Sequence, residues 1–92
     1  MTVLWSPQSR KGLEGFSEEK RERIIDKVVE FDKKERGNIK KIAEGLWRLR
    51  EGDYRVYYHQ DEDKTHILRV VHRKHAYRED LVKALKQEIE GL

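Results

Sequence analysis

The segment from His72 to Tyr77 gathers the residue types that cleave a phosphodiester without a metal. It reads HRKHAY and contains His72, Arg73, Lys74, His75 and Tyr77. In RNA cleavage a general base takes the proton of a 2′-hydroxyl, cations stabilise charge on the phosphoryl oxygens, and an acid protonates the leaving oxygen. Histidine can serve either proton-transfer role near neutral pH, and arginine supplies positive charge. The alternative interpretation is a basic loop that caps the last strand, with Tyr77 anchoring the next helix.

A second group of cations alternates with apolar residues in a predicted β-hairpin. If Gly52 and Asp53 are the central residues of its turn, Arg50 lies opposite Arg55. Directly paired residues share a face of the sheet. The face suited to packing under helices then collects Trp47, Leu49, Tyr54, Val56 and Tyr58. The opposite face collects Leu46, Arg48, Arg50, Arg55, Tyr57 and His59.

Two interpretations of the arginine-bearing face stay open. An arginine directly opposite another arginine destabilises a sheet unless an anion neutralises the pair. Internal acids such as Glu51 and Asp53 would make it a solvated face held by ion pairs. The other interpretation is a surface for RNA, on which Arg48 and Arg50 bind phosphates and Tyr57 stacks on a base.

The elements that must position these residues form an α+β fold. We expect a strand over residues 2–5, a short helix from Ser6 and Pro7, and a longer helix from Ser17 to Gly37. Three strands follow, at residues 46–50, 54–59 and 65–71, and a C-terminal helix covers residues 78–90. We therefore predict one domain over residues 1–92, with an N-terminal strand and a helical hairpin packed on a small twisted antiparallel sheet. The apolar stripe expected on the long helix is Ile24, Ile25, Val28 and Val29, which Phe31 can extend. The stripe expected on the last helix is Leu81, Val82, Leu85 and Ile89.

Composition narrows the possible chemistry. The chain of 92 residues has no cysteine, which excludes disulfides and thiolate metal sites. The four histidines show no metal-ligand spacing, so we expect no metal and no cofactor. No apolar run approaches the roughly 20 residues of a membrane span, and no signal peptide is evident. We therefore expect a cytoplasmic protein without a membrane partner.

The strings LWRLREGDYRVYY and THILRVVHRKHAYR resemble the RelE family of toxins from type II toxin–antitoxin pairs. The resemblance implies a metal-independent ribonuclease that cleaves mRNA on the ribosome and inhibits translation. It also implies a cognate antitoxin that covers the basic face of the toxin. Matching the positions of the family cleft gives Arg48, Arg50, Arg55, Arg73 and Tyr77. Because arginine is a poor general base, His72, His75 and Tyr77 are all candidates for that role, and Lys74 is a further RNA-binding candidate.

The same resemblance is compatible with two other functions of this chain. The sister ParE group shares the fold but inhibits DNA gyrase, and no nuclease residues are needed for that. A catalytically silent relative would use the same basic face only to bind an antitoxin.

Overall fold

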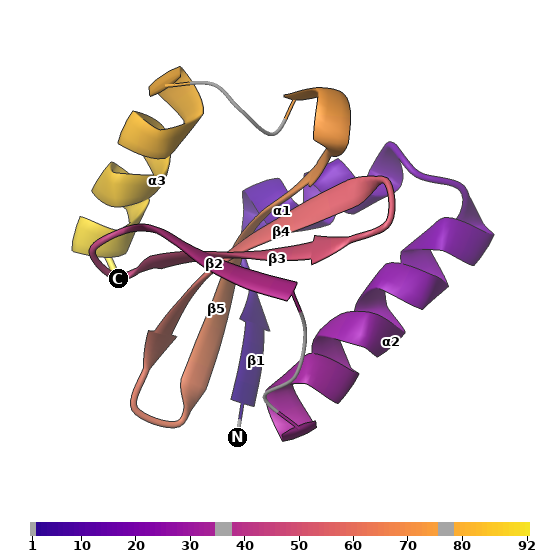
Figure 1. Ribbon diagram of the computed structural model, residues 1–92, viewed down its shortest axis with the longest axis horizontal. Helices are drawn as coiled ribbons and strands as arrows, with labels where there is room; N and C mark the ends of the chain where they lie inside the picture. Colours follow the sequence, from indigo (N-terminus) through magenta and orange to yellow (C-terminus); the bar gives the residue numbers. More distant parts are fainter. Residues whose placement is uncertain (1, 35–37, 76–78) are drawn as a thin grey trace.

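The computed structural model describes residues 2–34, 38–75 and 79–92, which form the predicted α+β fold (Figure 1). In chain order the elements are β1 (Thr2–Trp5), α1 (Pro7–Glu14), α2 (Glu18–Lys34), β2 (Asn38–Ala43), β3 (Leu46–Glu51), β4 (Tyr54–Asp61), β5 (Lys64–His72), a 3₁₀ turn η1 (Arg73–His75) and α3 (Glu79–Glu90). The strands form one sheet in the order β1-β5-β4-β3-β2. The predicted helix stop at Gly37 lies outside the described residues.

The sheet differs from the prediction in two strands. β1 pairs with β5 in parallel, so the sheet is mixed rather than antiparallel throughout. β2 was not predicted, because a bulge between Lys41 and Ala43 interrupts the alternation of side chains that identifies a strand. The hairpin register is confirmed pair by pair, from Glu51 opposite Tyr54 to Trp47 opposite Tyr58. A second tight turn joins β4 to β5, since Asp61 pairs with Lys64.

The helical hairpin of α1 and α2 covers one face of the sheet. The buried residues of this first core are Leu13, Ile24, Val28, Phe31, Leu49, Tyr54, Val56, Tyr58, Ile67 and Val70. The hairpin face predicted for packing is therefore confirmed, with Trp47 partly buried at its edge. The predicted stripe on α2 is too wide, because Ile25 and Val29 remain 38% and 39% exposed. Only the side of α2 that bears Ile24 and Val28 faces the sheet.

The C-terminal helix α3 covers part of the opposite face, and Figure 1 shows it across the sheet from α2. Leu46, Tyr57, Leu68 and Leu85 are all buried in this second core, and Leu81, Val82 and Ile89 pack around them. A short ion pair adds to the packing: Arg69 Nη1 lies 2.7 Å from Glu88 Oε1, and both side chains are mostly buried. α3 is thus anchored at its centre and near its last turn.

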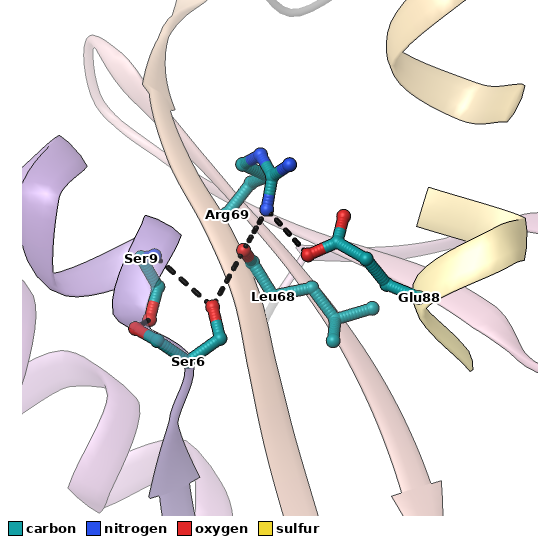
Figure 2. Close-up of polar contacts among 5 residues, drawn as sticks. All are labelled: Ser6, Ser9, Leu68, Arg69 and Glu88. Atoms are coloured by element: carbon teal, nitrogen blue, oxygen red, sulfur yellow. Dashed lines mark hydrogen bonds and ion pairs between the residues drawn. The ribbon is translucent and has the colours of Figure 1, made fainter. Parts of the chain in front are cut away.

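The start of α1 is bonded to β5 at Leu68, next to the Arg69 side chain that holds α3. Ser6 caps the helix, because its Oγ accepts a hydrogen bond from Ser9 N at 3.0 Å. The Ser6 hydroxyl also donates to the Leu68 carbonyl, which accepts a second bond from Arg69 Nη1 (Figure 2). Leu68 is the extra residue of a bulge in β5, since Tyr57 pairs with Arg69 whereas Tyr58 pairs with Ile67. The bulge carbonyl therefore joins the cap of α1 to the side chain that holds α3.

Gly12 lies inside α1 and does not end it. A Cβ atom at this position would lie 2.6 Å from the Val70 carbonyl oxygen, so glycine allows α1 to rest directly against β5. The next helix begins as predicted, with Ser17 Oγ accepting from Lys20 N. No helix in the parts of the chain that the structure describes is long and apolar enough to cross a membrane.

Candidate functional site

The pairing of the strands places basic side chains from three strands on one face of the sheet. Arg48 pairs with Tyr57 and Arg50 pairs with Arg55, so all four share the face that α3 partly covers. Lys40 of the edge strand pairs with Arg48 and extends the row outward. Lys40 was missed from sequence because β2 itself was missed. We call Lys40, Arg48, Arg50, Arg55 and Arg73 the basic cluster.

Arg55 is the buried centre of this cluster. Its side chain is only 9% exposed, and Nη1 donates to the carbonyl oxygens of Gly52 and Tyr54, each at 2.9 Å. These bonds tie the guanidinium to the β3–β4 turn and fix its position. Burial lowers the pKa of Arg55, and the positive charges of Arg50, Arg48 and Arg73 lower it further. The three neighbours thus lie close enough to raise the local positive potential, which an anion would relieve.

The end of β5 brings Arg73 to the same turn. The backbone N–H of Arg73 donates to the Asp53 carbonyl at 2.8 Å, and Arg73 Nε lies 3.9 Å from Asp53 Oδ1. The Arg73 side chain remains 60% exposed, so this contact leaves its guanidinium accessible. Arg55 and Arg73, which are 18 positions apart in the sequence, are therefore held by the same hairpin tip.

Tyr57 lies beneath α3, where it cannot stack on a base. It is 1% exposed and belongs to the second core. The prediction placed Tyr57 on the correct face of the hairpin but took that face as open. Docking of α3 explains the difference, because the sequence alone did not show which part of the face the helix would cover. In this structure Tyr57 is a core residue at the edge of the basic cluster.

His72 lies on the face opposite the basic cluster. It pairs with Tyr54, whose side chain is in the first core, and it lines a groove of about 560 Å³ beside Gly12, Phe16 and Lys20. The backbone N–H of Lys74 donates to His72 Nδ1 at 3.2 Å, so the neutral ring carries its proton on Nε2. The structure therefore does not bring His72 together with the arginines as a general base.

The remaining predicted residues follow β5. Lys74 is exposed within η1, one position after Arg73. The backbone of His75 ends η1, whereas its side chain and all of Tyr77 lie outside the described residues. Their roles stay predictions. Within residues 2–34, 38–75 and 79–92, no group of three or more His, Cys, Asp or Glu side chains is arranged to hold a metal ion.

Comparison with known proteins identifies the class. Residues 3–77 match the family described as the ParE toxin of the type II toxin–antitoxin system parDE. This match spans most of the chain, which therefore belongs to the ParE toxin family, within the RelE/ParE superfamily. The protein is a toxin of a type II toxin–antitoxin system. No curated protein sequence gives a match.

Two solved structures show the same fold. One is the RelB–RelE antitoxin–toxin complex from Methanococcus jannaschii, with a TM-score of 0.66 and 28% identity over 78% of this chain and 92% of that chain. The other is the RelBE2 toxin–antitoxin complex from Mycobacterium tuberculosis, with a TM-score of 0.53 and 29% identity over 78% of this chain and 96% of that chain. The resemblance to the superfamily and the fold class predicted from sequence are confirmed.

Proposed function

We propose that this toxin is an endoribonuclease that cleaves mRNA on the ribosome without a metal ion and thereby inhibits translation. The observation that carries the proposal is the basic cluster around Arg55. Arg50 is the direct cross-strand partner of Arg55, Arg48 lies on the same face, and Arg55 and Arg73 are both bonded to the β3–β4 turn. Such a concentration of planar, permanently charged donors suits the phosphate oxygens of RNA.

Each arginine has a role that follows from its placement. Arg55 is buried and held by two backbone carbonyls, so it supplies a fixed positive charge beneath the site where a phosphate would bind. Arg73 is exposed and stabilises the negative charge that develops on the phosphoryl oxygens. Arg48 and Arg50, with Lys40 and Lys74 at the sides, bind neighbouring phosphates. The general base is assigned to His75 or Tyr77, because His72 faces the other side of the sheet.

A cognate antitoxin and a cytoplasmic site of action complete the proposal. The two solved structures described above are complexes of a toxin with an antitoxin. An acidic segment of such a partner would neutralise the basic cluster, and association with it would weaken as salt screens the charges. Ribosomes and mRNA are encountered in the cytoplasm.

Replacement of Arg73 by alanine tests the nuclease directly. The side chain is mostly exposed and supports no core, so the variant should fold with an unchanged melting temperature. Loss of one positioned cation should slow cleavage by about 100-fold or more. The measurement is primer extension on mRNA in a translating extract. The matched control is Arg10→Ala, which removes an exposed arginine from α1. A folded Arg73→Ala protein that cleaves at the normal rate would remove Arg73 from the site.

A second function, inhibition of DNA gyrase, is favoured by the family match itself, because the matching family is that of the ParE toxin. The two functions differ in their products. A nuclease produces position-specific cuts within translated codons, whereas a gyrase inhibitor leaves mRNA intact and blocks supercoiling of plasmid DNA by purified gyrase. Intact mRNA together with blocked supercoiling would replace the first proposal by the second. Normal growth with neither effect would identify a silent antitoxin-binding relative.

A further inference from the structure

We propose that His59 and His66, on the sheet face that also bears the basic cluster, form a binding site for a divalent transition metal. The ligand class is the set of borderline ions that prefer imidazole, such as Zn²⁺, Ni²⁺ and Cu²⁺. The sequence spacing of the two residues showed no ligand pattern, because the site is created by the pairing of two strands rather than by a helix or a loop.

The two rings are neighbours on one face of the sheet. His59 of β4 and His66 of β5 are direct partners in the antiparallel ladder, so they lie side by side on one face. Their ring centroids are 6.1 Å apart, and the ring planes are inclined by 30°. Two imidazoles that bind one tetrahedral ion through Nε2 have centroids about 5 Å apart. The observed separation is about 1 Å wider than this, so binding requires the two side chains to move closer together.

The hydrogen bond of His59 prepares its ring for a metal. His59 Nδ1 lies 2.6 Å from the carbonyl oxygen of Gly45, and a carbonyl only accepts, so Nδ1 carries the proton. The neutral ring then has its lone pair on Nε2, which is the atom available to a metal ion. Histidines that bind metals almost always donate their other N–H in this way to a carbonyl or a carboxylate.

The β2–β3 turn is shaped around this ring. Gly45 adopts φ +75°, in the left-handed region, and a Cβ atom there would lie only 3.2 Å from His59 Nδ1. Glycine thus serves both the turn and the close approach of the imidazole. The orientation of His59 is consequently set by the backbone and does not need a bound ligand to form.

The rest of the coordination sphere is open to solvent. Both histidines are partly exposed to solvent. No third His, Cys, Asp or Glu joins them within the described ranges 2–34, 38–75 and 79–92. Water therefore fills the other positions around the ion. Two neutral nitrogen ligands are a poor match for Mg²⁺, which prefers oxygen ligands.

Titration calorimetry of the purified full chain with NiCl₂ and with ZnCl₂ tests the site. We expect one ion per chain and a dissociation constant that rises by about tenfold or more, equivalent to about 1.4 kcal/mol, when His66 is replaced by alanine. The matched control is His72→Ala, which removes a histidine from the other face and should leave binding unchanged. MgCl₂ should give no binding.

Melting temperatures with and without Ni²⁺ provide a second test, which includes the His59→Ala variant. His59→Ala removes the ligand and also the bond to Gly45, so its melting temperature without metal is recorded first. Saturating Ni²⁺ should raise the melting temperature of the wild type and of His72→Ala, and should leave that of His59→Ala and His66→Ala unchanged. Equal binding by the wild type and His66→Ala would overturn the proposal. A loss of affinity in His72→Ala equal to that in His66→Ala would also overturn it.

Discussion

Replacement of Leu85 by alanine should release α3 from the sheet while leaving the first core folded. Leu85 is 0% exposed and is the central buried residue of the helix, packed in the second core with Leu46, Tyr57 and Leu68. Truncation of a fully buried leucine costs about 2–5 kcal/mol. α3 has 12 residues, and an isolated helix of that length is marginal in water, so its order depends on docking. A loss of this size should therefore act first on the docking of α3.

Amide hydrogen exchange measures this effect residue by residue. Each 1.4 kcal/mol corresponds to about a factor of ten, so exchange within residues 81–89 should accelerate by about 30-fold or more. The amides of Ile24 and Val28 in α2 should change much less, because they belong to the core on the other face. Exposure of Tyr57 should accompany undocking, since α3 covers its side chain.

The matched control is Lys86→Ala, which changes an exposed neighbour on the same helix and should leave exchange unaltered. Two outcomes would refute the reasoning. Unchanged exchange in α3 would mean that Leu85 does not hold the helix. Equal acceleration in α2 and α3 would mean that the two cores unfold as one unit, so that α3 has no independent docking equilibrium.

Three further predictions concern the core and the sheet. Trp47→Ala should lower the free energy of unfolding by about 3 kcal/mol, near the lower end for a large aromatic residue, because Trp47 is only partly buried. A melting curve like that of the wild type would contradict the packing of Trp47 against the first core. Gly12→Ala should lower the free energy of unfolding, measured by urea denaturation, by about 1–2 kcal/mol, because the clash of the new Cβ with a backbone carbonyl outweighs the gain in helix propensity of about 1 kcal/mol. Gly91→Ala is the control and should be neutral, because the nearest atom to its Cβ lies at 3.6 Å. Burial raises the pKa of Tyr58 from 10.0 to about 12, so the folded state keeps a proton that the unfolded chain loses. Because burial also raises the pKa of Tyr54, the test compares variants: between pH 10 and 12 the wild type should lose about 2 kcal/mol more stability than Tyr58→Phe, and equal losses would show that Tyr58 does not contribute.

The sequence by itself determined the local structure where one side-chain pattern dominated. Ser6 and Pro7 predicted the start of α1, and Ser17 predicted the start of α2. Gly52 and Asp53 set the register of β3 and β4, and that register placed Arg48, Arg50 and Arg55 on one face. These features depend on interactions between residues close in sequence, so composition and spacing were sufficient to predict them.

Only the tertiary structure decided how each face of the sheet is used. Both faces of the hairpin are partly apolar, and the docking of α3 divides the second face into a buried part with Tyr57 and an open part with Arg50 and Lys40. The bulge at Leu68 shifts the register of β5 by one residue, and the end of β5 places His72 on the opposite side from the arginines. The contact of Arg73 with Asp53 is likewise long-range. Such contacts depend on strand order and on which helix covers which face, and no spacing within a single segment encodes them.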